Sequence, residues 1–208
     1  MHLAAAVVAN KSLQIDAYVA SLIPPILTCL IGRHLGGDDL SLDKMKEKYY
    51  LRDLSASLLN QIVTKYGKSS GELQTRLTRT CLKAFLQPLR TSGEHYGAII
   101  GIISVGGAPA VASLIVPNIK PFEYVMKKEG DGNEYGKQML VSALMKAVMM
   151  LVPEGSAGES LQVNGTANGH TDEAKQVEEY LGSIIGSRVA GTARKELIRA
   201  VLEVRDKL

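Results

Sequence analysis

The sequence contains few of the residues from which metal and redox sites are built. Among 208 residues there are two cysteines, Cys29 and Cys81, and four histidines scattered along the chain. None of them pairs with another at the spacing of a zinc site. Two cysteines far apart in apolar runs are typical of free thiols in a reducing compartment. The sequence therefore favours neither a metal centre nor a disulfide framework.

Motifs for nucleotide binding and for catalysis are also missing. Gly101 and Gly106 stand at the spacing of a phosphate-binding loop, but Gly107 and Ala108 occupy the places of its lysine and hydroxyl residues. No G-x-G-x-x-G, G-x-S-x-G or H-E-x-x-H pattern occurs. The carboxylates stand singly or in solvated runs. We therefore expect no enzyme, no cofactor and no small-molecule substrate.

Charge of one sign does not dominate, and one stretch has no charge at all. The net charge of +3 neither requires nucleic acid nor excludes it. Residues 96–119 are uncharged and long enough to cross a bilayer. However, Gly106, Gly107 and Pro109 near the middle are typical of a turn, with proline in the first turn of the next helix. We expect two short buried helices there and no membrane partner.

The sequence does contain a clear helical hairpin. Apolar residues recur at three- and four-residue steps through 51–66 and again through 73–85, which predicts two amphipathic helices. Gly67 ends the first, and Ser69, three residues before Glu72, predicts a capping box for the second. Neither helix can bury its apolar face alone, whereas stacked pairs can. No convincing strand pattern occurs. The sequence predicts a scaffold of helix pairs.

Prolines and a low-complexity stretch complete the predicted architecture. We expect apolar helices over 15–35 and 109–128. Pro24–Pro25 and Pro117 lie inside them, where proline kinks a helix or begins a new segment. We predict an all-α fold, an α-solenoid of about five antiparallel HEAT-like helix pairs, in a single domain over 1–208. Pro24 and Pro117 are expected to shape contacts between repeats. The Gly-, Ser- and Asn-rich residues 153–170 are expected to form a mobile loop.

Two groups of charged residues are candidates for interaction sites. Arg76, Arg79 and Lys83 share one face of the helix over 73–85, opposite its apolar residues. This face is either solvated and paired with neighbouring acids, or it docks an acidic partner or phosphates. No aromatic residue interleaves with it, which counts against single-stranded nucleic acid. Arg52 and Asp53 near the start of the hairpin are expected to bridge repeats structurally, with partner binding as the alternative.

Four segments, taken in order and spacing, resemble a known family. They are YVASLIPPILTCLIGRHL, LRDLSASLLNQIVTKYG, QTRLTRTCLKAFLQ and HYGAIIGIISVGGAPAVASLIVPNI. They resemble the C-terminal HEAT-repeat domain of the TFIID subunit six family, TATA-box-binding-protein-associated factors of which several are shared with the SAGA coactivator. The match runs from Leu3 to about Lys128, and from Asn133 onward it weakens to a helical pattern.

The resemblance implies a nuclear, non-enzymatic scaffold that supports assembly of the RNA polymerase II preinitiation complex. Its implied partners are other TFIID or SAGA subunits. The family also carries an N-terminal histone fold that these residues lack, so we expect the chain to be a domain of a longer protein. The alternative is a basic helical-repeat array that binds nucleic acid directly, and a weak DNA contact fits either reading. Duplex binding that falls steeply with salt would favour the alternative.

Overall fold

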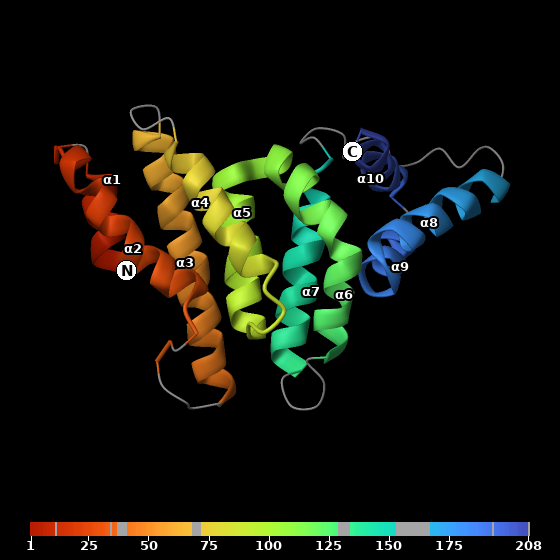
Figure 1. The fold of residues 1–208 in the computed structure, drawn as a ribbon, viewed down its shortest axis with the longest axis horizontal. Helices are drawn as coiled ribbons and strands as arrows, with labels where there is room; N and C mark the ends of the chain where they lie inside the picture. The colour runs from red at the N-terminus through yellow and green to blue at the C-terminus, as the bar shows by residue number, and fades with distance from the viewer. Residues whose placement is uncertain are drawn as a thin grey trace. The chain divides into compact units, whose positions relative to one another are not determined.

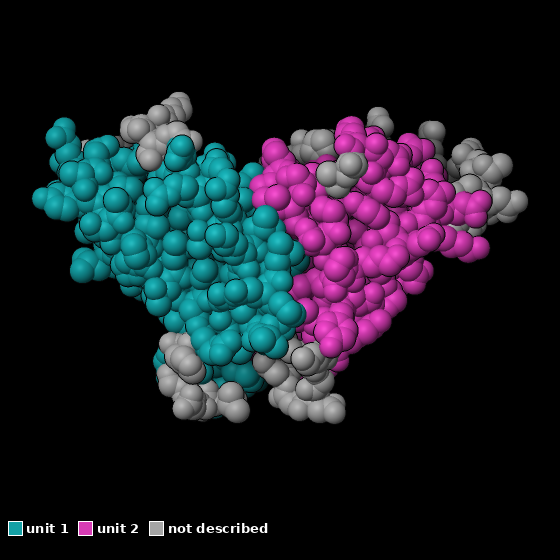
Figure 2. All heavy atoms as spheres, viewed as in Figure 1, with its two compact units in different colours: residues 1–107 teal, residues 108–208 magenta. Residues whose placement is uncertain are grey.

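The computed structural model of the chain describes residues 1–10, 12–33, 35–36, 41–67, 72–128, 134–152, 167–192 and 194–207. These described residues form helices and contain no strand, so the predicted all-α fold is confirmed. Contacts divide the chain into two compact units, Met1–Gly107 and Ala108–Leu208, which Figure 2 colours separately. Each unit is built from packed helices with its own buried apolar residues.

The first unit is a succession of helices, of which α5 is the most deeply buried. It consists of α1 (His2–Ala9), the 3₁₀ turn η1 (Asp16–Tyr18), α2 (Val19–Ile31), α3 (Leu42–Tyr66), α4 (Leu73–Phe85) and α5 (Ser92–Ala110), which runs just past its boundary. In Figure 1, α2 to α5 follow one another from red to green, and α2 packs directly on α3. The two helices predicted for the hairpin are present as α3 and α4.

Two predicted helix boundaries in this unit are wrong. The helix expected to extend to residue 35 ends at Ile31, because Gly32 leaves the helix with extended backbone angles (φ −73°, ψ 150°). The predicted capping box at Ser69 does not begin the next helix. α4 starts at Leu73 with Glu72 at its N-cap and no side-chain cap bond, and Ser69 lies outside the described residues.

The core of the first unit surrounds α5. Nearly every residue from 92 to 105 is buried. A Cβ atom at Gly97 would lie 1.9 Å from the Leu30 carbonyl oxygen of α2, and one at Gly101 would lie 2.7 Å from the Cys81 Sγ of α4. Both glycines therefore allow neighbouring helices to approach the α5 backbone. The absence of charge in this helix from Tyr96 onward agrees with its burial.

The uncharged stretch is a packed and broken helix. By length and hydropathy alone, Ser92–Lys127 qualifies as a candidate membrane span within the part of the chain that the structure describes, and half of its most apolar window is buried inside the protein. Gly107 breaks it with φ 62° and ψ −163°, a conformation that favours glycine. The predicted turn is confirmed at Gly107, whereas only the segment before it is a regular, largely buried helix.

Beyond that turn, the chain does not form the single kinked helix expected up to residue 128. A π-helical turn, η2 (Val111–Ile115), leads into a 3₁₀ turn, η3 (Val116–Asn118), and then into α6 (Ile119–Lys128). Pro117 lies in η3, where its missing N–H interrupts regular α-helical bonding. Pro24 and Pro25 differ, because they lie exposed within α2 and the helix continues through them.

The second unit packs α6 with four further helices. These are α7 (Glu134–Met149), α8 (Ala167–Leu181), α9 (Ser183–Gly191) and α10 (Lys195–Lys207). Leu140, Leu144, Val177, Leu181 and Ile185 are among its fully buried side chains. The predicted mobile loop ends too late, because residues 167–170 already belong to α8. Cooperative helix growth outweighs the low propensity of Asn168 and Gly169. Residues 153–166 lie outside the described residues.

Candidate functional site

A buried arginine joins α3 to the end of α2. The Arg52 side chain is 3% exposed, and its guanidinium donates to the Leu30 carbonyl at 2.5 Å and to the Gly32 carbonyl at 2.9 Å. Carbonyls in the last turn of a helix lack intrahelical partners and carry partial negative charge. Arg52 therefore caps α2. Burial lowers the pKa of Arg52 to about 10, so it stays charged at neutral pH.

The neighbouring Asp53 connects α3 to α5 instead. Its Oδ1 accepts a hydrogen bond of 2.7 Å from the Tyr96 hydroxyl. The Tyr96 ring packs edge-on against Tyr49, with ring centroids 4.8 Å apart. The two residues singled out in the sequence thus contact two different helices, and both contacts lie within the first unit. Asp53 itself is exposed, so of the two only Arg52 is a buried polar side chain whose contacts help to fix which helices meet.

Sequence reasoning missed a second polar cluster around Glu94. This carboxylate is 3% exposed and accepts from Arg33 Nε at 3.3 Å, Arg90 Nη1 at 2.9 Å and the Thr91 backbone N–H at 2.9 Å. Arg90 also donates to the Ile31 carbonyl at 3.2 Å. Burial by itself would raise the pKa of Glu94, but the bonds from Thr91 and Arg33 hold it below its ordinary value. The cluster locks the start of α5 to the end of α2.

Two buried titratable groups in the first unit carry no charge at neutral pH. His95 is fully buried, and burial lowers its pKa to about 4. Burial also raises the pKa of the Cys81 thiol to about 12. A thiol reacts as its thiolate, so Cys81 is a packing residue rather than a nucleophile. Neither group supplies the poised acid, base or nucleophile that catalysis requires.

The basic residues of α4 point to solvent. Arg76, Arg79 and Lys83 are all exposed, whereas Leu77 and Cys81 on the other side of the helix are buried. Within the described part of the chain, none of the three cations forms an ion pair. α4 itself contains no acidic residue. The face is thus a strip of positive charge with no ion pair among the described residues, on a helix whose opposite side is anchored in the core.

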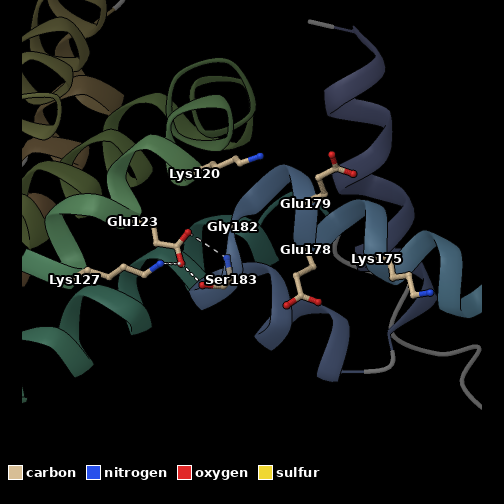
Figure 3. A pocket seen from close by; sticks show the side chains of 8 residues that line it. All are labelled: Lys120, Glu123, Lys127, Lys175, Glu178, Glu179, Gly182 and Ser183. Carbon is tan, nitrogen blue, oxygen red and sulfur yellow. Dashed lines mark hydrogen bonds and ion pairs between the residues drawn. The ribbon is translucent and has the colours of Figure 1, made fainter.

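The second unit has an open pocket between α6 and the α8–α9 corner, with a volume of about 480 Å³ (Figure 3). Its central carboxylate, Glu123, accepts from the backbone N–H groups of Ser183 and Ile184, each at 3.2 Å, and from the Ser183 hydroxyl. Lys127 Nζ lies 3.1 Å from it. Glu123 therefore caps the N-terminus of α9. Its hydrogen-bonding capacity is used structurally.

No metal centre emerges from the described residues, in which no group of three or more His, Cys, Asp and Glu side chains could hold an ion. Helix pairs stacked around buried polar contacts, with charge displayed on an outer helix face, define an α-solenoid protein of the HEAT-repeat class. Residues 1–120 match the TAF6 C-terminal HEAT repeat domain family. The chain belongs to that family, which confirms the resemblance drawn from the four sequence segments.

Several curated proteins are similar to the chain. The SAGA complex/transcription factor TFIID complex subunit Taf6 of Schizosaccharomyces pombe is 34% identical over 208 residues, covering 98% of this chain and 43% of the relative. Transcription initiation factor TFIID subunit 6 of Arabidopsis thaliana is 32% identical over 142 residues, covering 68% of this chain and 25% of the relative. The chain thus spans less than half the length of these relatives. The fission yeast alignment also continues past residue 133, where the resemblance had weakened.

Proposed function

We propose that this chain is a protein-docking module of a TFIID- or SAGA-type transcription factor subunit. In this role it is a non-enzymatic scaffold that acts in the nucleus and supports assembly of the RNA polymerase II preinitiation complex. The names of the fission yeast and Arabidopsis relatives support the transcription role. The observation that carries the docking role is the α4 face, where Arg76, Arg79 and Lys83 are exposed and have no ion pair among the described residues.

A scaffold reading fits how the buried polar groups are used. Arg52 caps α2, Glu94 holds the start of α5, and Glu123 caps α9. Each polar side chain therefore stabilises helix ends or helix contacts, rather than converging on a cavity where a substrate could react. Rigid helices with these contacts satisfied present fixed outer faces, which lowers the entropic cost of binding a partner.

We also propose that both compact units belong to one HEAT domain spanning 1–208. The fission yeast alignment over 98% of the chain supports this extent. In this domain Arg52 and Asp53 act structurally between helices, and Pro24 and Pro117 shape the helices that carry the repeat contacts. Arg52 in particular is too deeply buried to reach a partner.

The docking role is tested by reversing the charge of the α4 face in the full-length subunit. We expect R76E/R79E/K83E to leave the helical fold intact, because all three side chains are exposed, and to reduce incorporation into the parent complex. The loss should deepen at low salt, where repulsion is less screened. The matched control R194E/K195E/R199E makes the same charge change on exposed residues at the start of α10, with Arg194 just before the helix and Lys195 and Arg199 in it.

Two outcomes count against this proposal. Normal incorporation of the folded α4 variant at every salt concentration would remove the α4 face from the docking role. Tight duplex DNA binding by the wild-type chain, steeply salt-dependent and lost in the α4 variant alone, would favour the nucleic-acid alternative. Both tests require that the α10 control is incorporated as the wild type is. Circular dichroism of each variant checks that its helical fold is intact.

A further inference from the structure

The basic face of α4 continues into exposed apolar side chains. Positions 76, 79, 83 and 86 are separated by three, four and three residues, which places them on one face of the helix. Leu86, the C-cap residue, is 51% exposed, and Leu89 in the following turn is 79% exposed. We name this set, Arg76, Arg79, Lys83, Leu86 and Leu89, the α4 strip. It combines positive charge with an apolar end.

The apolar end of the strip is held in place although it faces solvent. The Leu86 N–H bonds to the Leu82 carbonyl at 3.0 Å, and the Leu89 carbonyl accepts from Arg33 Nη2 at 3.1 Å. Arg33 is itself bonded to the buried Glu94. The backbone at Leu86 is therefore fixed by the last turn of α4, and the backbone at Leu89 is tied to the polar cluster at the start of α5. A binding partner would not have to bear the entropic cost of ordering this turn.

The order of charge and apolar surface indicates what fits the strip. Phosphates would use the cations but gain nothing from burying the two leucines, and a purely acidic segment would leave them in water. A chain with carboxylates at one end and large apolar side chains at the other complements both parts. The strip from position 76 to 86 is about 15 Å long at the helical rise of ~1.5 Å per residue, which matches about three turns of a partner helix.

We propose that the α4 strip binds an acidic peptide segment that carries large apolar residues at one end. The carboxylates lie over Arg76, Arg79 and Lys83, and the apolar residues cover Leu86 and Leu89. This inference rests on the proposed docking function and specifies its partner. Glu72, exposed just before α4, places a negative charge at the basic end of the strip. It disfavours acidic segments that extend beyond Arg76 and so sets the register.

Synthetic peptides test the partner chemistry with the 208-residue chain. One fluorescent peptide carries acidic residues at helical spacing followed by two leucines, and a second replaces both leucines with serine at the same charge. The wild-type chain should bind the leucine peptide at least about tenfold more tightly, since covering even one of its two leucines contributes about that factor. L86S/L89S should remove this preference and leave binding of the serine peptide unchanged.

Charge variants complete the test. R76E/R79E/K83E should abolish binding of both peptides, whereas R194E/K195E/R199E should bind both as the wild type does. Equal affinity of the wild-type chain for the two peptides, or an unchanged preference in L86S/L89S, would overturn the inference. So would displacement of both peptides by short duplex DNA at physiological salt.

The peptide result and the incorporation result separate the two proposals. If the leucine preference is absent while R76E/R79E/K83E still blocks incorporation into the parent complex, the docking function stands and the acidic–apolar partner is rejected. If incorporation is normal while the leucine preference is present, the strip binds such peptides but does not dock the subunit. If the preference is absent and incorporation is normal, both proposals fail.

Discussion

Arg52 illustrates how a charged side chain is accommodated in the core of the first unit. Its guanidinium spans two carbonyls at the end of α2, and the two glycines Gly93 and Gly97 of α5 leave room for it. The planar fork of arginine suits two acceptors at once, which a lysine ammonium does not match. The cost of burying the charge is offset by charge-assisted bonds to the otherwise unpaired helix end.

Replacing Arg52 with methionine should destabilise the chain by about 2–4 kcal/mol. The change removes two hydrogen bonds from a charged donor, each contributing about 1.5–3 kcal/mol, while relieving part of the desolvation cost. Urea denaturation followed by circular dichroism measures it. Arg79→Met is the control, because Arg79 is exposed and its loss should stay within about 0.5 kcal/mol. Equal losses in the free energy of unfolding for the two substitutions would show that the Arg52 cap of α2 does not stabilise the fold.

His95 should make stability depend on pH. Its folded pKa of about 4 lies below the ordinary value of 6.5, so the unfolded chain binds the proton first as pH falls. Stability is therefore complete above pH 6.5 and is lost as pH falls from 6.5 towards 4, by up to roughly 3 kcal/mol. Denaturation curves at several pH values measure this slope. His95→Gln should flatten it between pH 6.5 and 5, and an identical slope in the variant would contradict the assignment.

At the scale of single helices, α5 is the element on which the first unit depends. Its burial between α2, α3 and α4 requires neighbours to approach its backbone, and Gly97 and Gly101 allow this at two turns of one face. The same helix is also tied at its start by Glu94 and at Tyr96 by Asp53. Apolar packing and polar contacts therefore both fix the position of α5 against its neighbouring helices.

Gly97→Ala should destabilise the chain by about 1–3 kcal/mol or more, because the added methyl would meet the Leu30 backbone carbonyl rather than a movable side chain. Gly191→Ala is the matched control. Gly191 is also helical, but nothing lies within 4 Å of its added Cβ, so the change should be neutral or stabilise by up to ~1 kcal/mol. Thermal unfolding of both variants measures the pair. A loss of stability for Gly97→Ala no larger than that for Gly191→Ala would mean that α2 and α5 are not in close contact.

Helices with regularly spaced apolar residues could be predicted from the sequence, whereas the contacts between helices could not. The three- and four-residue spacing of apolar residues through 51–66 predicted α3, because this spacing is a local property of the segment and indicates one buried helix face. The partners of Arg52 lie on another helix, at Leu30 and Gly32, and no local pattern indicates them. Glu94 carried a readable signal, the capping box that begins at Thr91. The same pattern at Ser69 was misleading, so the pattern alone is insufficient.

At the scale of the whole molecule, the proposed docking function depends on outer surfaces rather than on a cavity. The position of Arg76, Arg79 and Lys83 on one face followed from helical spacing, and their exposure agrees with it. The exposure of Leu86 and Leu89 could not be predicted, because apolar residues are expected to be buried and only the fold shows which of them are exposed. The proposed function requires that the α4 strip docks another subunit.

Docking of another subunit on the α4 strip can be tested by cross-linking the intact parent complex with a lysine-reactive reagent. Mass spectrometry then identifies the linked residues. Lys83 lies in the middle of the α4 strip and is exposed, so docking predicts cross-links from Lys83 to another subunit. The flanking residues of that subunit should combine acidic and large apolar side chains. Lys195 on α10 provides a comparison for an exposed lysine outside the strip. Cross-links from Lys83 confined to its own chain, with Lys195 linked to other subunits, would contradict the account.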